Sequence, residues 1–493
     1  MNQEASMAQM AQRLDKLYEF DREPVGEDRL HKGSRFANVF AGEHVAGTEF
    51  VIGAMFVLHG VTATDLLVGL IIGNLLAVLS WTLICAPIAT QVRLTLYWYV
   101  RKIAGPGVMV IYNLANAFLY CILAGAMITV SATAVGIPFN IPMPKLNDLY
   151  PNSVGWVVVV VAIGVVVGTV AILGFKRVSQ FSAVCVPWMF LVFIAGAIAV
   201  LPQLGEVRSF ADFMQIAHTK IWNGVPAEGQ EKLGMMHIIF FAWFCNLAMH
   251  VGLSDMALFR YAKHWAYGLY SAVGMYLGHF LAWICSGIMV AAYGPTIEPG
   301  PMAYNAAGVA GALCVVLAGW TTANPTIYRS GLAIQIVTPN WPRWVTTTIA
   351  FLTATFMAIF PAFVMNLLNF VALYGLILMP IGAVVFTEHW LFPLMGLEQF
   401  WAEKRKVMFN WPAMITWIAV LLICLWPYAI SIATALGLPS FLISLLQAFD
   451  VFNPVSKLHL YFRWLPGYIL AMVFYIGLSI AWGAKSSKGG MPA

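Results

Sequence analysis

Three ionisable side chains stand inside the first long apolar stretch of the chain. The segment FAGEHVAGTEF, residues 40–50, holds Glu43, His44 and Glu49 among glycines and alanines. A charged group at the centre of a membrane span costs about 3 kcal/mol or more, so it usually faces a cavity or a partner. Small neighbours let a helix unwind, and the freed carbonyls can coordinate a cation. A second interpretation places Glu43 and His44 at the level of the cytoplasmic lipid headgroups.

A second polar interruption combines an amide with aromatic rings. The segment FAWFCNLAMHVGLSD, residues 241–255, contains Asn246, His250 and Asp255 beside Trp243 and Phe244. Flat rings next to a buried amide suit a planar solute that forms hydrogen bonds. The alternative is aromatic packing, with Asn246 bonded to a neighbouring helix.

Amides and hydroxyls mark two further segments. Asn113 and Asn116, in NLANAFLY at 113–120, lie three residues apart and therefore share a helix face. In LAGWTTANPTIYRSGL, residues 317–332, Thr321 and Thr322 precede Pro325, which removes a backbone donor and frees a carbonyl. Hydroxyls and free carbonyls form an oxygen site that suits Na⁺. A kinked helix whose hydroxyls bond to its own carbonyls explains the same pattern.

The elements that position these residues are apolar helices. Of the 493 residues, 61% are hydrophobic and only 10% are charged, which is too few charges for a soluble surface. A membrane-spanning helix needs about 20 apolar residues. The sequence therefore predicts an all-α polytopic membrane protein with about twelve transmembrane helices. These are expected near residues 38–60, 65–88, 106–136, 154–175, 181–201, 235–259, 266–294, 305–333, 344–363, 366–391, 411–436 and 464–483.

The distribution of basic residues predicts the orientation. With a cytoplasmic N-terminus, 20 of the 26 Lys and Arg residues fall on the inside, Arg329 among them. Both termini are therefore expected in the cytoplasm of a cell that carries the protein in its plasma or inner membrane. Glu388 and His389, at the end of the tenth span, are expected at a solvated helix end. The longest polar interruption, 202–234, separates two sets of five spans.

Several motifs together resemble the nucleobase:cation symporter-1 family of cytosine, purine, allantoin and hydantoin permeases. The most specific is WTTANPTIYRSGL at 320–332, which resembles the eighth helix of cytosine permease. Others, in family order, are IIGNLLAVLS at 71–80, RLTLYWYVRKIAGPG at 93–107, GLSDMALFRYAK at 252–263 and YLGHF at 276–280.

The resemblance implies a LeuT-like fold, with two inverted five-helix repeats, broken helices 1 and 6, and two extra C-terminal helices. The expected units are an N-terminal cytoplasmic segment (1–37), the first repeat (38–201) and an external loop (202–234). The second repeat (235–391), the C-terminal helices (411–483) and a cytoplasmic tail (484–493) follow.

The resemblance also implies which residues bind ligands. The coupling ion Na⁺ would be held by Glu43, Ala46, Ala318, Thr321 and Thr322, where Glu43 departs from the small or apolar residue usual in the family. The solute would contact Gly47, Asn116, Phe118, Tyr120, Trp243, Phe244, Asn246 and Asn324.

The leading hypothesis is a cation-coupled symporter for a small planar nitrogen heterocycle. Proton coupling through Glu43 or Glu49 is the alternative. A membrane enzyme that uses Glu43, His44, His250 and Asp255, or a sensor that binds without transport, are remoter hypotheses. We expect no enzymatic activity, no cofactor besides the coupling ion and no nucleic-acid partner. The partners expected are a small-molecule substrate and the lipid bilayer, with the protein a monomer or a weak oligomer.

Overall fold

The regular structure of the protein is helical. The computed structural model describes residues 19–20, 22–294, 298–338, 340–365 and 367–484. Within them, nine helices are long and apolar enough to cross a membrane, or ten if α2 and α3 form one bent span. The prediction of an all-α multi-pass membrane protein is confirmed, whereas a total of twelve spans stays a prediction.

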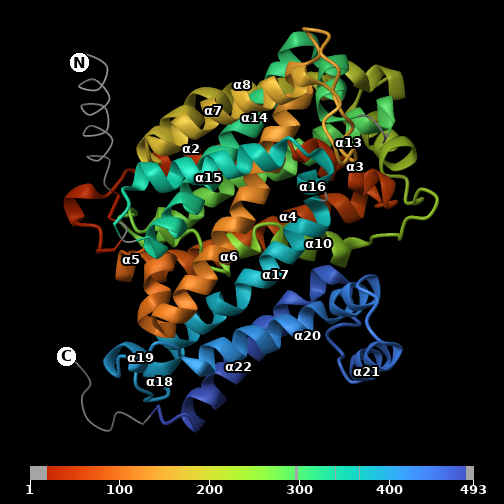
Figure 1. Ribbon diagram of the computed structural model, residues 1–493. Helices are drawn as coiled ribbons and strands as arrows, with labels where there is room; N and C mark the ends of the chain where they lie inside the picture. The colour runs from red at the N-terminus through yellow and green to blue at the C-terminus, as the bar shows by residue number, and fades with distance from the viewer. Residues whose placement is uncertain (1–18, 21, 295–297, 339, 366, 485–493) are drawn as a thin grey trace, which may run out of the picture.

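The first set of helices runs to residue 204 (Figure 1). It consists of α2 (Gly33–His44), α3 (Glu49–Leu58), α4 (Ala63–Ser80) continued by η2 (Trp81–Cys85) and α5 (Ala86–Val92), α6 (Leu96–Val135), α7 (Val154–Ile172) and α8 (Phe175–Leu204). Side-chain hydroxyls begin three of them. Thr62, Thr95 and Ser153 accept hydrogen bonds from the backbone N–H of Asp65, Trp98 and Trp156 at 3.0–3.2 Å, as N-cap residues do.

The second set follows the connection that contains α9 (Phe210–Ile216). It consists of α10 (Met235–Phe244), α11 (Leu247–His250), α12 (Met256–Phe259), η4 (Trp265–Tyr270), η5 (Val273–Phe280), α13 (Leu281–Tyr293), α14 (Pro299–Val337), α15 (Arg343–Ala358), α16 (Pro361–Met365) and α17 (Leu367–Phe386). After it come η6 (Thr387–Leu391), α18 (Phe392–Leu394), α19 (Trp401–Lys404), α20 (Trp411–Ala435), α21 (Ser440–Val451) and α22 (Trp464–Ala481).

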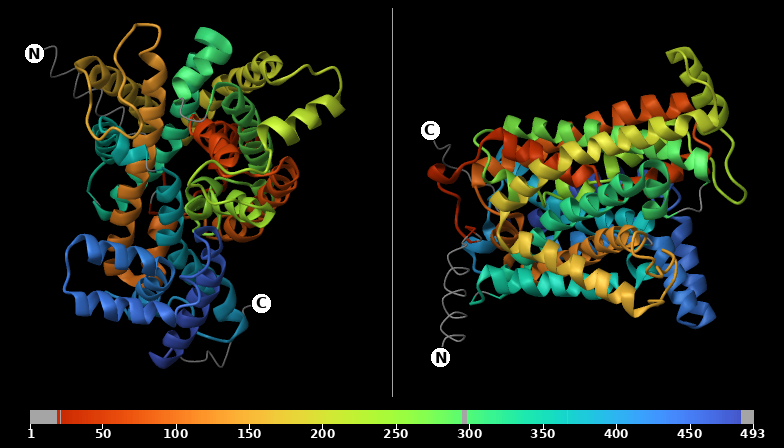
Figure 2. Two further views of the ribbon diagram at one scale, coloured as in Figure 1. Left: turned by 90° about the vertical axis from the view of Figure 1, so that its right-hand side faces the viewer. Right: turned by 90° about the horizontal axis from the view of Figure 1, so that it is seen from above.

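The two sets pack on each other in a reciprocal way. Helix α3, from the first set, packs on α13, and α10, from the second set, packs on α4. Long helices α6 and α14 lie against each other at the centre. Glycine permits that approach, because a Cβ on Gly319 would lie 2.5 Å from the carbonyl oxygen of Met127. Helices α20 and α22 pack together on one flank of this bundle, as Figure 2 shows.

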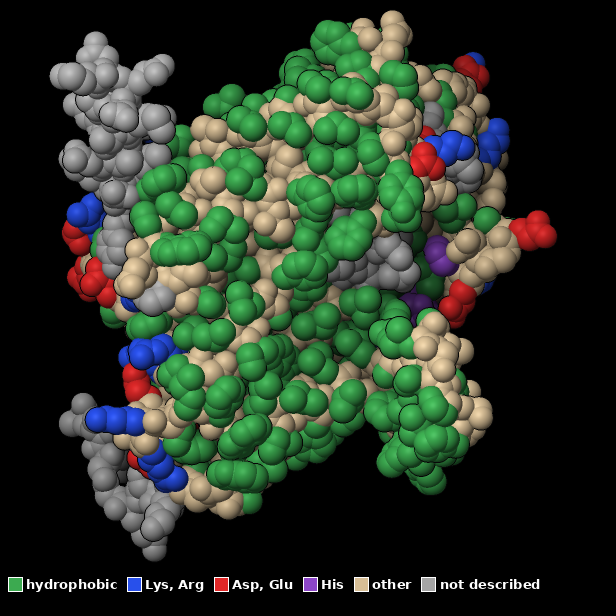
Figure 3. Space-filling view, in the orientation of Figure 1, with side chains coloured by type: hydrophobic (Ala, Val, Ile, Leu, Met, Phe, Trp, Pro, Cys, Tyr) green, Lys and Arg blue, Asp and Glu red, His purple; other side chains and the backbone are tan. Residues whose placement is uncertain are grey.

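The surface matches a protein embedded in lipid. Charged side chains gather at two opposite edges of the face in Figure 3, and the region between them is hydrophobic. Valine, leucine and isoleucine side chains that are exposed on α7, α8 and α20 form part of the apolar surface, for example Val158 and Leu191. Such a band suits contact with acyl chains.

The segment before α2 closes one end of the bundle. The His31 ring packs against both Phe175 and Tyr261, at centroid distances of 5.5 and 5.1 Å, and those two rings lie 5.7 Å from each other. The hydroxyl of Tyr261 donates to the carboxylate of Glu19 at 2.6 Å, and Arg260 donates to the carbonyl of Phe20. This segment therefore contributes to the packing between α8 and the end of α12.

The expectation of a solvated end at Glu388 is wrong. Its side chain is buried in η6 and accepts hydrogen bonds from the hydroxyl of Tyr475 at 2.7 Å and from the backbone N–H of Phe400 at 2.5 Å. Helix α22 and the turn before α19 cover this position, and neither is close to it in the sequence. His389 is partly buried and bonds to Tyr99 and Gln91.

Candidate solute and cation site

A small cavity lies at the centre of the bundle, where two helix pairs are interrupted. Its volume is about 60 Å³. Residues of α2, α3 and the turn between them line it, namely Glu43, His44, Ala46, Thr48, Glu49 and Ile52. The other lining residues are Leu123 and Met127 of α6, Cys245 and Asn246 of the turn after α10, Met249 of α11, His279 of η5, Thr322 and Thr326 of α14, and Tyr374 of α17.

The first interruption separates α2 from α3. The two helices are bent by 53° relative to each other across residues 45–48. Gly47 lies in this turn, close to α6, because a Cβ at this position would lie 2.7 Å from a methyl carbon of Val130. The first turn of α3 forms directly afterwards, with the backbone N–H of Glu49 bonded to the carbonyl of Ala46 at 3.2 Å.

The second interruption lies between α10 and α11. Cys245 and Asn246 form a turn, and the carbonyl of Asn246 accepts from the N–H of Met249 at 2.9 Å. The side-chain amide nitrogen of Asn246 is buried without a hydrogen-bond partner. A polar group in this state is available to a ligand in the cavity.

Oxygen atoms converge beside the cavity at the contact between α2 and α14. The hydroxyl of Thr322 lies 3.1 Å from the carbonyl oxygen of Glu43, 3.4 Å from that of Gly42 and 3.0 Å from that of Ala318. A hydroxyl and several carbonyls are the ligands that a hard cation such as Na⁺ prefers. Thr321 differs, because its hydroxyl bonds within α14 to the carbonyls of Leu317 and Ala318.

A buried arginine joins two of the carboxylates that the sequence singled out. Arg329 of α14 has no solvent-exposed surface, and its guanidinium is paired with both carboxylate oxygens of Glu43. The same group donates to Asp255, just before α12, at 2.6 Å. Trp81 donates to the other oxygen of Asp255 at 2.6 Å. We call Arg329, Glu43 and Asp255 the ion triad; it connects α2, α12 and α14.

Glu49, by contrast, lies among aromatic and imidazole rings. The indole N–H of Trp283 donates to its carboxylate, and Nε2 of His279 lies 3.8 Å away. The His279 ring stacks on Trp283 at 4.3 Å and lies 4.6 Å from the ring of His44. Glu49 is also the first residue of α3, where the helix dipole favours a negative charge.

The structure brings some of the predicted residues together and not others. Glu43, Ala46, Glu49, Asn246 and Thr322 line the cavity. Gly47 and Thr321 are next to lining residues in the sequence, and Ala318 lies one helical turn before Thr322, but none of the three lines the cavity. Their roles as ligands stay predictions.

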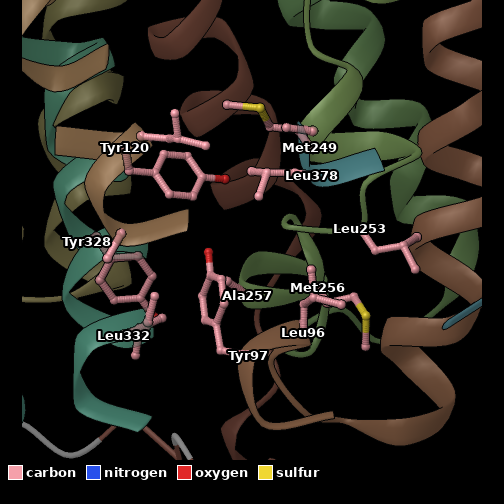
Figure 4. Close-up of a cluster of buried hydrophobic side chains, with 14 of the residues drawn as sticks. Leu96, Tyr97, Tyr120, Met249, Leu253, Met256, Ala257, Tyr328, Leu332 and Leu378 are labelled. Carbon is pink, nitrogen blue, oxygen red and sulfur yellow. The ribbon is translucent and has the colours of Figure 1, made fainter. Parts of the chain in front are cut away.

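Two predicted amides lie outside the lining. Both side-chain atoms of Asn116 and of Asn324 are buried without hydrogen-bond partners. Tyr120 packs edge-on against Tyr374 at 5.5 Å, and Tyr374 lines the cavity. In Figure 4, the hydroxyl ends of Tyr97 and Tyr120, which both belong to α6, point toward a common space.

The three remaining aromatic residues face elsewhere. Phe118 is 50% exposed on the outside of α6. The indole N–H of Trp243 donates to Ser80 at 2.8 Å, and its ring packs on Trp464 at 4.5 Å. Phe244 packs toward Tyr461. None of these three side chains lines the cavity, and their role as walls of the solute site stays a prediction.

Sequence reasoning missed Arg329, His279, Trp283 and Tyr374. The charge distribution predicts Arg329 on the cytoplasmic side, whereas the structure buries it within the long apolar helix α14. A signal was present, since the apolar segments contain one arginine and several acidic residues that need a partner. His279 stands in YLGHF, which had served only as a family motif.

These observations define a multi-pass membrane protein with a polar cavity at two helix interruptions. Its fold is that of solved transporters. It is similar to that of Mhp1, a nucleobase-cation-symport-1 family transporter, in a closed conformation with bromovinylhydantoin bound. The TM-score is 0.69 at 13% identity, over 94% of this chain and 96% of that chain. The inward-facing conformation of Mhp1 gives a TM-score of 0.66 at 13% identity, over 94% of this chain and 93% of that one.

A further similar structure is a Na⁺-coupled sialic acid symporter in a substrate-bound outward-open state. Its TM-score is 0.63 at 12% identity, over 98% of this chain and 97% of that one. No family model and no curated protein matches the sequence. All these similar structures are transporters rather than enzymes, and identities this low establish the shared fold.

Proposed function

We propose that the protein is a secondary active symporter that moves a small planar nitrogen heterocycle together with a cation, by alternating access. Nucleobases, hydantoins, allantoin and thiamine-precursor pyrimidines belong to this class. The observation that carries the proposal is the cavity at the two helix interruptions, where transporters of this architecture bind solute near the middle of the membrane.

Na⁺ is the coupling ion that the oxygen atoms around Thr322 support. Carbonyls of α2 and α14 lie within 3.4 Å of its hydroxyl, so a small movement of α2 would let them surround an ion. The candidate ligands are the Thr322 hydroxyl with the carbonyls of Glu43 and Ala318. The carboxylate of Glu43 itself is engaged with Arg329.

Proton coupling is the second candidate, and the position of Glu49 supports it. This carboxylate lines the cavity and has no lysine or arginine partner among the described residues, whereas Glu43 is paired with Arg329. Of the two proton carriers predicted from the sequence, Glu49 is therefore the better candidate.

The membrane-enzyme alternative finds little support. A guanidinium occupies the position between Glu43 and Asp255, two of the four residues that it required. In the part of the chain that the structure describes, no group of three or more His, Cys, Asp or Glu side chains is arranged to hold a metal ion.

The test combines binding with transport. Purified protein is screened by thermal shift against nitrogen heterocycles, with and without Na⁺, because a ligand that binds only the native state raises its apparent stability. Hits then enter counterflow assays in proteoliposomes. Counterflow that depends on Na⁺ supports the proposal; undiminished exchange without Na⁺ at fixed pH contradicts the sodium site. Binding without any exchange indicates a sensor and contradicts the symporter.

A further inference from the structure

The cavity region contains more carboxylates than cationic side chains. Glu43 and Glu49 line the cavity, and Asp255 is paired with Arg329, which is also paired with Glu43. Arg329 is the one positive partner of this group, and no lysine or arginine lines the cavity among the described residues. With three carboxylates and one guanidinium, the group has two more negative than positive side chains. A coupling cation at Thr322 would compensate one of them and leave the other.

The uncompensated carboxylate is that of Glu49. It is 2% exposed, and one of its oxygens accepts from Trp283, whereas the nitrogen of His279 lies 3.8 Å from the other, beyond hydrogen-bond distance. An ionised carboxylate can accept about four hydrogen bonds. A helix N-terminus contributes only about 0.3–1 kcal/mol, against several kcal/mol for taking an ion out of water. Glu49 is therefore short of both donors and positive charge.

A second acceptor lines the same cavity. His44 is 2% exposed, and its Nδ1 lies 2.6 Å from the carbonyl oxygen of Phe40. A carbonyl can only accept, so Nδ1 carries the hydrogen, and in the neutral ring Nε2 is then an acceptor. Nε2 is buried without a partner. The wall formed by α2 and α3 thus presents a carboxylate and an imidazole lone pair, and both complement N–H donors.

We propose that the solute presents a cationic, donor-only group to Glu49 and His44, namely a protonated amidine, a guanidinium or a protonated amino-heterocycle. This inference rests on the proposed function and specifies its substrate class. The solute and the coupling ion together then balance the two carboxylates.

The experiment uses two probes of the same shape and different charge. One is 2-aminoimidazoline, a cyclic guanidinium, and the other is 2-imidazolidinone, the neutral cyclic urea. Binding to the purified full-length protein is measured by thermal shift and exchange by counterflow. We expect the cationic probe to bind at least tenfold more tightly than the neutral one. Glu49→Gln should abolish this preference, by weakening the cationic probe at least tenfold and leaving the neutral one within about twofold.

A matched control makes the same change at another buried glutamate. Glu388→Gln lies in η6, away from the cavity lining, and should preserve the preference for the cationic probe. If Glu49→Gln does not fold, Glu49→Asp replaces it. That variant keeps the charge but withdraws it by one methylene, so it should weaken the cationic probe while retaining the preference.

The outcomes separate this inference from the proposed function. Neutral heterocycles that bind and exchange better than cationic ones overturn the inference and leave the symporter standing. An equal loss of both probes in Glu49→Gln, or no loss of either, also overturns it, as does unchanged cation affinity in Glu49→Asp. Failure of the wild-type protein to exchange any heterocycle, charged or neutral, contradicts the proposed function itself.

Discussion

Removing the guanidinium at the centre of the ion triad should destabilise the protein severely. Arg329→Met keeps an unbranched apolar stem but leaves Glu43 and Asp255 buried without their cation. Breaking a buried ion pair by removing one partner costs about 3–5 kcal/mol. Against a typical total stability of about 5–15 kcal/mol, this is a large fraction. We expect a lower yield of folded protein and a clear fall in the melting temperature.

Variants of Glu43 and Asp255, the two carboxylates paired with Arg329, show where this cost arises. If the cost arises from two uncompensated carboxylates, neutralising them in Arg329→Met/Glu43→Gln/Asp255→Asn should restore most of the stability, because replacing a complete buried ion group is often nearly neutral. The matched control is Arg101→Met, at an exposed arginine over the ring of Trp98, where about 0.5–1 kcal/mol is expected.

The assay is the heat-induced loss of the monodisperse peak in size-exclusion chromatography of detergent-solubilised protein. If Arg329→Met and Arg101→Met have the same melting temperature, the reasoning is refuted, because the ion triad would then contribute no more to stability than a surface cation. A triple variant as unstable as the single one would show that the loss arises from packing of the arginine stem rather than from the unpaired carboxylates.

Three further predictions concern transport and pH. Thr322→Val, which removes the hydroxyl that meets the α2 carbonyls, should raise the Na⁺ concentration for half-maximal uptake at least tenfold, whereas Thr434→Val, at an exposed hydroxyl of α20, should not change it. Phe118→Ala should leave solute affinity within twofold of wild type in the thermal-shift assay, because this ring faces away from the cavity. Burial and then Arg35 lower the pKa of His31 from 6.5 to about 4. The unfolded chain takes up this proton first, so stability should be constant above pH 6.5 and fall between pH 6.5 and 4, and His31→Phe should flatten that part of a melting-temperature profile.

The sequence predicted the all-helical, multi-pass character of the chain well, because this follows from local physics. Twenty apolar residues in succession require a membrane or a large core, and small residues such as Gly47 permit the break before Glu49. The positions of Asn246 and Thr322 at the cavity followed from polar groups that an apolar segment cannot otherwise accommodate.

The direction of the aromatic side chains could not be predicted in the same way. In a soluble protein an apolar stripe marks the buried face of a helix, but lipid is as apolar as a protein core. Phe118 and Tyr120 are two residues apart in one apolar helix, and one faces outward while the other is buried. Hydrophobicity carries no signal that separates them, so only the packing of α6 against its neighbours decides.

The ion triad limits how the helices around the cavity can move. Arg329 belongs to α14, Glu43 to α2 and Asp255 to the start of α12, so a displacement of α2 or α12 away from α14 parts a buried ion pair. Parting one pair in a dry interior costs about 3–5 kcal/mol, more than the 1–3 kcal/mol typical of coupling between sites. Helices α2 and α12 must therefore either move together with α14 or let water reach the carboxylates as they separate. The hydroxyl of Thr322 lies on the same contact between α2 and α14, so an ion bound there would strengthen the connection that the triad already makes.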